Sequence, residues 1–411
     1  MGPGTVVAHA VTIMKIEKIE TFALQAKWTD DKAYWGSRAW GKQTSDQVRE
    51  ISTEYPVSLR RRFVYSTTMD TVIVKLTADN GLVGYGEAKA PVAPQATKQI
   101  IDLLLADIVL GADPQEVTVL WERMYACMRV RGHRAGFFTE AISGVDIALW
   151  DLVGKSAGLP IHQLMGGAFR ESVRVYASGL PGLSAQAPDV DFARLGDDAE
   201  ALRTLGYTGL KMALGKGIQG DLRSVRTVRQ RLGDDFLLYV DAAGAYDKAQ
   251  ALRIGKELED LGVGWFEMPI FPEDIEGYVE LAKALTIPIA LDSLTSRYEA
   301  GEFIRRGGLD VVQPDVCRAG GITECRRIAE LADAFGLAFA PHVSIGSAIH
   351  IAATAHLASA MPNTVISEYW IGENPLGNAI LREPIVLKDG YLDTPKGAGL
   401  GIDIIESRVL G

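Results

Sequence analysis

The second half of the chain contains a series of short apolar runs that end in or near ionisable residues: FLLYVDA (236–242), VGWFEMP (263–269), PIALDS (288–293), LDVVQPD (309–315) and LAFAPHV (337–343). Three similar runs complete the series: VRVYASG (173–179), TGLKMAL (208–214) and TVISEYW (364–370). Amphipathic stretches separate them, and such alternation predicts parallel strands joined by helices. Eight units of this kind favour an α/β fold, the (β/α)₈ barrel. An open doubly wound sheet is the alternative, but no GxGxxG motif follows the first run to support a dinucleotide site.

The first part of the chain has a different texture and predicts a smaller α+β unit. Residues 14–26 alternate apolar and polar side chains, as a half-buried strand does. Residues 70–88 predict a β-hairpin whose turn falls at Asn80 and Gly81. Two helix-like segments follow, near residues 92–109 and 114–128.

Two segments of this part fit no regular element. Residues 28–46 hold Trp28, Trp35 and Trp40 among glycine and polar residues, and long loops inside compact domains are usually functional. We expect this loop to cover the mouth of the barrel; a packed surface loop or a subunit contact is the alternative. Residues 1–13 lack the basic and apolar regions of a signal peptide, so we interpret them as a tail before a strand that opens at Met14.

Composition narrows the class of partner. The 411 residues include 42 Lys and Arg against 52 Asp and Glu, a net charge of −10, which argues against nucleic acid or an anionic membrane. A small anionic substrate would need a local cation. The 3 cysteines form no CxxC pair, which disfavours a disulfide framework and a structural zinc site. We therefore expect the protein to be located in the reducing cytoplasm. No apolar run of about 18 residues predicts a membrane-spanning helix.

Ionisable residues recur at matched places in successive runs. Asp241, Glu267, Asp292, Asp315 and His342 are separated by 26, 25, 23 and 27 residues, which is about one βα unit each. They should therefore lie at one level of the barrel. The carboxyl ends of the strands face the active site in such barrels, so we expect these side chains to converge there.

Three carboxylates on successive strands cannot all stay ionised without a counter-charge. Oxygen ligands from Asp241, Glu267 and Asp292 suit a hard divalent cation, and Mg²⁺ is the usual ion where water and substrate complete the shell. The alternative is that each carboxylate caps a helix or forms a structural ion pair. Lys211 in the second run and Glu368 in the eighth extend the set of charged residues.

One histidine of the chain is placed to act as a base. His342 and Asp315 lie on adjacent strands, and a histidine oriented by a buried carboxylate is a common general base. His350 and His356 fall in the helical stretch IHIAATAHLASA, and we interpret them as core residues.

A second stretch, AISGVDIALWDLVGKSAGLPIHQLMGG (141–167), resembles a signature of the enolase superfamily, in its mandelate racemase and muconate-lactonising branch. The match rests on the following positions: Ala141, Gly144, Asp146, Ala148, Asp151, Gly154, Lys155, Pro160, Leu164 and Gly166. The resemblance implies a modified TIM barrel over residues 136–378, with an α+β capping domain over 14–135. The segment 379–411 looks like the family's C-terminal return to that domain.

The resemblance also implies roles for individual residues. The family's metal ligands fall on Asp241, Glu267 and Asp292, and its catalytic dyad falls on His342 and Asp315. Lys211 matches the first lysine of a Lys-x-Lys motif, and Glu368 matches a carboxylate near the substrate.

Four positions depart from the family pattern. Ala213 replaces the second lysine, the usual base on the face opposite the histidine, and Ala243 replaces an Asn often found after the first ligand. Met268 stands where Glu or Gln usually follows the second ligand, and Ser293 follows Asp292 where the racemase type has Gly-Glu.

These residues imply Mg²⁺-dependent removal of the proton alpha to a carboxylate, with Lys211 as the local cation. Because Ala213 removes the second base, we expect an enzyme that dehydrates a sugar acid, an aldonate or aldarate, to a 2-keto-3-deoxy acid. The alternative is an isomerase: an epimerase, racemase or lactone cycloisomerase. A second alternative is a degenerate homologue that binds a ligand without turnover. The expected partners are a small anionic carboxylate substrate and further copies of the chain in a homo-oligomer.

Overall fold

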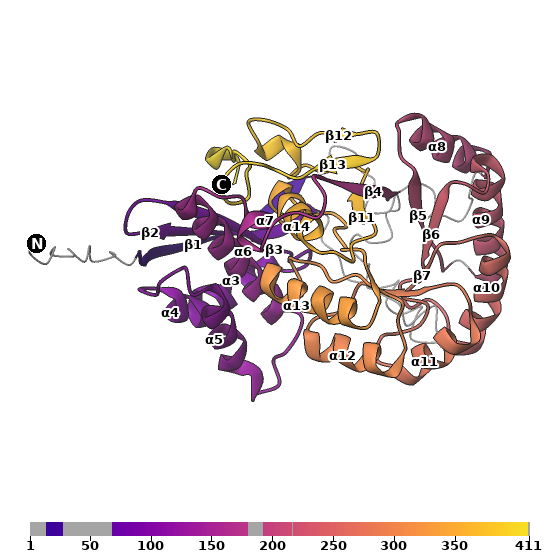
Figure 1. Ribbon diagram of the computed structural model, residues 1–411, viewed down its shortest axis with the longest axis horizontal. Helices are drawn as coiled ribbons and strands as arrows, with labels where there is room; N and C mark the ends of the chain where they lie inside the picture. The colour runs from indigo at the N-terminus through magenta and orange to yellow at the C-terminus, as the bar shows by residue number, and fades with distance from the viewer. Residues whose placement is uncertain (1–13, 28–67, 180–191, 216, 410–411) are drawn as a thin grey trace, which may run out of the picture.

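The computed structural model describes residues 14–27, 68–179, 192–215 and 217–409 (Figure 1). The N-terminal tail at 1–13 and the loop at 28–46 lie outside these ranges, so the expectation that the loop covers the barrel mouth stays a prediction. Among the described residues, no helix combines the length and the apolar character needed to cross a membrane.

The N-terminal unit is a small antiparallel sheet covered by helices, as the sequence predicts. Its strands β1 (Ile16–Lys27), β2 (Thr68–Ala78) and β3 (Val83–Ala88) pair in that order. The β2–β3 turn falls at Asn80, whose Oδ1 accepts a hydrogen bond from the Leu82 amide, and Gly81 follows with φ +83°. The helical elements after the sheet are α3 (Pro94–Ile100), η3 (Ile101–Leu105), α4 (Ala106–Val109) and α5 (Val117–Arg129).

All eight apolar runs of the sequence form parallel strands. They are β4 (Ser172–Ser178), β5 (Gly209–Ala213), β6 (Leu237–Asp241), β7 (Phe266–Glu267), β8 (Ile289–Leu291), β9 (Val311–Val312), β10 (Ala338–Phe339) and β11 (Ser367–Trp370). Pairing runs without a break from β4 to β10, and β11 pairs with β4. A bridge between Phe339 and Thr364 joins the β10 side to the segment before β11 and closes the barrel.

Helices follow the strands on the outside of the barrel. They are α8 (Phe192–Thr204), α9 (Ile218–Leu232), α10 (Lys248–Asp260), α11 (Ile275–Ala284), α12 (Arg297–Arg306), α13 (Gly321–Ala334) and α14 (Ala348–Ala360). Figure 1 shows α8 to α12 as an arc around the strands. This arrangement confirms the predicted modified TIM barrel with an α+β capping unit.

The stretch 141–167, which resembles the family signature, forms two helices where the two units meet. It includes most of α6 (Phe137–Ala157), which is buried over most of its circumference, and all of the short helix α7 (Ile161–Leu164). The backbone of β3 lies directly on α6, because a Cβ atom at Gly86 would come within 1.9 Å of the Gly144 carbonyl oxygen. A Cβ at Gly84 would come within 2.3 Å of the Ala148 carbonyl oxygen. Glycine is therefore required at both positions.

Two aspartates of this stretch hold segments together. Asp151 accepts hydrogen bonds from the Tyr85 amide in β3 (2.8 Å) and from the Leu400 amide in the C-terminal segment (2.8 Å). Asp146 accepts from the amide and hydroxyl of Thr323 in the first turn of α13, at 3.0 and 2.6 Å. Burial raises the pKa of Asp146 to about 7, and the two Thr323 hydrogen bonds oppose that effect. The signature aspartates thus serve the architecture.

The C-terminal segment runs back along the barrel to the capping unit. Its elements are η4 (Asn378–Ile380), β12 (Leu387–Lys388), β13 (Tyr391–Asp393) and η5 (Glu406–Arg408). Strand β13 pairs antiparallel with β4, and Glu406 then forms an ion pair with Lys75 of β2 at 2.8 Å. The course of the chain matches the predicted return, while the domain boundaries at residues 135 and 378 stay predictions.

The close approach of β3 to α6 predicts that Gly86→Ala is strongly destabilising. The added methyl group has no room between two backbones, so we expect a loss of about 1–3 kcal/mol or more in the free energy of unfolding, measured by urea denaturation. Gly301→Ala is the matched control, because its Cβ meets nothing closer than 3.6 Å and the change should gain up to about 1 kcal/mol of helix propensity. Equal effects of the two substitutions would contradict this packing.

Candidate active site

The three predicted metal ligands lie at the carboxyl ends of neighbouring strands. Asp241 is the last residue of β6, Glu267 is the last residue of β7, and the two are partners in the sheet register. Asp292 is the first residue after β8. All three side chains are largely shielded from solvent, with Glu267 fully buried. The structure therefore brings these residues to one end of the barrel, as their spacing in the sequence predicts.

In the part of the chain that the structure describes, one buried ammonium group, that of Lys211, lies among these carboxylates. Lys211 Nζ lies 2.8 Å from Glu267 Oε1, 3.1 Å from Glu368 Oε1 and 3.6 Å from Asp241 Oδ2. Burial alone would lower the pKa of Lys211, but these neighbours raise it well above its usual value. Lys211 is therefore a cation at neutral pH and is the buried counter-charge of Glu267, Glu368 and Asp241. The guanidinium of Arg318 lies 3.8 Å from Asp292 Oδ2.

One ammonium does not balance the negative charge around it. Burial raises the pKa of Glu267 well above its usual range, and repulsion from Asp241 and Asp292 adds to the rise against the opposing effect of Lys211. Burial raises the pKa of Asp241 in the same way, again with Lys211 opposing and Asp292 adding to it. Asp292 Oδ1 is buried and has no hydrogen-bond partner among the described residues. This all-oxygen donor set suits a hard divalent cation.

The carboxylate oxygens of Asp241, Glu267 and Asp292 lie farther apart than the ligand atoms of a bound metal ion do. Among the described residues, one trio of possible ligands has atoms that all lie within 4.8 Å of one another, and it is Glu87, Cys317 and His350. In the predicted cluster Glu267 instead divides its two oxygens between Lys211 and Gln313, whose Nε2 donates to Oε2 at 3.0 Å. Binding of an ion by Asp241, Glu267 and Asp292 would therefore require these side chains to move closer.

The predicted dyad is formed. His342 Nδ1 donates to Asp315 Oδ2 at 2.9 Å, and the backbones of the two residues form a parallel bridge. Burial would raise the pKa of Asp315, but His350, Lys89 and the His342 hydrogen bond hold it well below its usual range. An ionised Asp315 accepts the proton on Nδ1, so in the neutral imidazole the lone pair is on Nε2.

The free nitrogen of His342 faces the carboxylate cluster. Its Nε2 lies 3.6 Å from Asp292 Oδ2 and 3.5 Å from Glu368 Oε2. The arrangement is suited to taking a proton from carbon next to a bound carboxylate.

Glu368 is placed as an orienting group. Its Oε2 accepts hydrogen bonds from the amides of Val343 (2.9 Å) and Ser344 (2.7 Å), directly after His342. Ser344 adopts a left-handed backbone with φ 50° in this turn. Burial would raise the pKa of Glu368, but Lys211, His342 and hydrogen bonds that include the one from the Val343 amide lower it well below its usual range. An ionised carboxylate that is engaged in this way fixes Lys211 and the turn after His342.

Three contacts of the dyad and cluster were not predicted from the sequence. Lys89 Nζ lies 3.1 Å from Asp315 Oδ2, and Gln313 binds Glu267. His350 is buried, as predicted for a core residue. Its Nε2 also lies 3.1 Å from Asp315 Oδ1, a contact that the sequence does not predict. Gln313 could have been found, because it precedes Asp315 by two residues at the end of one strand.

The two halves of the chain match two family models. Residues 47–166 match the mandelate racemase / muconate lactonizing enzyme N-terminal domain, and residues 194–408 match an enolase C-terminal domain-like family. The chain belongs to the mandelate racemase and muconate-lactonising family of the enolase superfamily. The resemblance that the stretch 141–167 carries is thereby confirmed, and this member of the superfamily is an enzyme.

Similar proteins of this superfamily include enzymes that act on acid sugars. D-galactarolactone cycloisomerase from Agrobacterium fabrum is 35% identical over 81% of this chain and 88% of its own length. Arabinonate dehydratase from Saccharolobus solfataricus is 34% identical over 82% of this chain and 88% of its own. A solved racemase from Streptomyces coelicolor A3(2) with bound magnesium is 26% identical, with a TM-score of 0.80 over 96% of this chain and 98% of that one.

The position of Lys211 predicts a large effect of Lys211→Met on stability. Removal of the ammonium leaves Glu267 and Glu368 buried without their counter-charge, which should cost about 3–5 kcal/mol in the free energy of unfolding measured in EDTA. Lys248→Met is the control, because it breaks an exposed pair with Glu280 and should leave stability unchanged. A small and equal effect of both substitutions would show that the cluster does not depend on Lys211.

Proposed function

We propose that this enzyme dehydrates a sugar acid, an aldonate or aldarate, to a 2-keto-3-deoxy acid in a Mg²⁺-dependent reaction. The observation that carries the proposal is the His342–Asp315 dyad, whose Nε2 faces the carboxylate cluster. Ala213 stands two residues after Lys211 on β5, so the strand offers no second basic side chain there. One base on one face is sufficient for an elimination.

Asp241, Glu267 and Asp292 are the residues that would hold Mg²⁺. Their oxygen-only donor set and the unpartnered Oδ1 of Asp292 fit such an ion. When bound, the ion supplies positive charge for the substrate carboxylate and for the negative charge that develops there. The Streptomyces racemase with bound magnesium supports this choice of metal.

The residues of the chain account for the proton steps. His342 takes the α-proton at Nε2 while Asp315 holds the Nδ1 proton, and the electron pair of the C–H bond moves toward the carboxylate. Lys211 stabilises that charge. The C–O bond to the β-hydroxyl then breaks, and the proton on His342 leaves with the hydroxyl as water. The enol that remains tautomerises to the 2-keto acid, so one molecule of water is lost overall.

A cycloisomerase is the second candidate. It is favoured by the 35% identity to D-galactarolactone cycloisomerase and by the presence of Lys211 in the site. Such an enzyme would use the same α-proton chemistry on a lactone, but the ring oxygen on the β-carbon would be the leaving group, so the ring would open without loss of water. A degenerate homologue is not supported, since the dyad is formed. The anionic substrate belongs to this proposal, and the homo-oligomer stays a prediction.

Metal binding is tested by thermal stability. We expect MgCl₂ to raise the melting temperature over that in EDTA, because a ligand at 100 times its Kd stabilises the folded state by about 2.7 kcal/mol. Asp241→Asn should abolish this increase. Asp107→Asn is the control, since Asp107 is exposed on α4 far from the strand ends in sequence. A Mg²⁺-dependent increase that survives Asp241→Asn would contradict the proposed ligand.

The reaction is tested with a panel of acid sugars that includes arabinonate, D-galactonate and D-galactarolactone. We expect at least one aldonate or aldarate to yield a 2-keto-3-deoxy acid, detected with semicarbazide, and His342→Asn to lower kcat by about 10²–10⁴-fold or more. His133→Asn, at an exposed position, should leave kcat unchanged. Conversion of D-galactarolactone to a product of the same mass, with no loss of water from any open-chain acid, would favour the second candidate, and no turnover of any compound of the panel would contradict both.

A further inference from the structure

The end of strand β3 carries two charged residues that reach from the capping unit into the barrel. Glu87 accepts hydrogen bonds from the Ser347 amide (3.1 Å), the Ser347 hydroxyl (2.5 Å) and the His350 amide (3.1 Å), at the beginning of α14. Its other oxygen accepts from Thr71 Oγ1 at 2.8 Å. Glu87 is therefore a cap on the amino end of α14.

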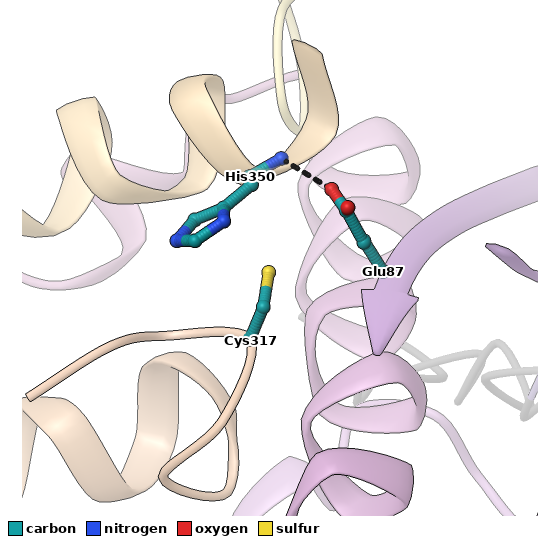
Figure 2. Close-up of side chains that lie close together, drawn as sticks. All are labelled: Glu87, Cys317 and His350. Carbon is teal, nitrogen blue, oxygen red and sulfur yellow. Dashed lines mark hydrogen bonds between the residues drawn. The ribbon is translucent and has the colours of Figure 1, made fainter. Parts of the chain in front are cut away.

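Figure 2 shows Glu87 with Cys317 and His350, the trio whose possible ligand atoms lie close together. Both oxygens of Glu87 are already used by the helix and by Thr71. Burial raises the pKa of the Cys317 thiol well above its usual value, and Glu87 and Asp315 add to the rise. A neutral thiol and a carboxylate engaged in capping make this trio a structural contact and not a metal centre.

Lys89 lies two residues further along and contacts Asp315 of the dyad and the residue that follows His342. Its Nζ is 3.1 Å from Asp315 Oδ2, the oxygen that also accepts from His342 Nδ1. The same Nζ donates to the carbonyl of Val343 at 3.0 Å, one residue after His342. Lys89 is itself buried, and its amide donates to the Cys317 carbonyl at 3.0 Å.

The remaining partners of Asp315 cannot replace Lys89. Oδ1 accepts from the Cys317 amide at 2.8 Å and lies 3.1 Å from His350 Nε2. Among the described residues, therefore, His342 and Lys89 are the two groups that bind Asp315 Oδ2. One ammonium ion fixes the oxygen that orients the imidazole and also the backbone that carries the imidazole.

We propose that Lys89, a residue of the capping unit, is a positioning residue for the His342–Asp315 pair. It holds the carboxylate rotamer and the Val343 carbonyl so that His342 Nε2 points at the carboxylate cluster. The role rests on the proposed function of His342 as the base, but the contact itself can be tested without substrate.

The experiment compares Lys89→Met with Lys155→Met. Lys155 is a matched control, because its Nζ also binds one buried aspartate, Asp151 (2.6 Å), and one backbone carbonyl, that of Val83 (2.9 Å), away from the dyad. Proton–nitrogen NMR of ¹⁵N-histidine-labelled enzyme reports the Nδ1 proton of His342, which is assigned by its loss in His342→Asn. The second readout is kcat and KM on the acid sugar of the panel that is turned over fastest.

We expect Lys89→Met to shift or abolish the His342 Nδ1 proton signal and to lower kcat by about 10–100-fold with little change in KM, as loss of an orienting partner typically does. Lys155→Met should lower the melting temperature and leave both readouts unchanged. If Lys89→Met does not fold, Lys89→Gln should show the same two changes. An unchanged signal with kcat equal to that of Lys155→Met would overturn the proposal. An altered signal in an enzyme that turns over no acid sugar would support Lys89 and contradict the proposed function.

Discussion

The electrostatic balance around Lys211 is the constraint on which the site depends. The barrel brings Asp241, Glu267 and Glu368 to one buried place, and a single ammonium lies within 3.6 Å of all three. Like charges in a poorly solvated site are tolerated only with a counter-charge. The excess of buried negative charge destabilises the folded protein when no cation is bound, and it suits the cluster to a divalent cation. That cation and Lys211 would then provide the positive charge for an anionic substrate.

The fold separates the residues that build the molecule from those placed for chemistry. Asp146 and Asp151 lie in the stretch most typical of the family, yet they bind backbone amides of β3, α13 and the C-terminal segment. Gly86 lets β3 lie directly on α6. This packing carries the end of β3 to the barrel mouth, where Glu87 and Lys89 meet the segments around His342. The capping unit is thus joined to the barrel beside the proposed base.

Much of the fold could be predicted because its signals are periodic. The spacing of Asp241, Glu267 and Asp292 matches one βα unit, so the sequence alone places them at one end of the barrel. The contacts of Lys89 and His350 with Asp315 could not be predicted in this way. Lys89 follows β3 in the capping unit, and His350 lies in the helix α14, so neither belongs to the series of residues at the strand ends. The ionised, hydrogen-bonded state of Glu368 likewise depends on a turn geometry that no local pattern shows.

In the proposed reaction, His342 is the one base of the site and Lys211 is a fixed charge. The most direct measurement is α-proton exchange in D₂O, followed by NMR, for pairs of acid sugars that differ only in α-configuration. We expect exchange in one configuration, which is lost in His342→Asn and is slowed but still confined to that configuration in Lys211→Met. Exchange in both configurations, with one lost in His342→Asn and the other in Lys211→Met, would show two working bases and contradict it.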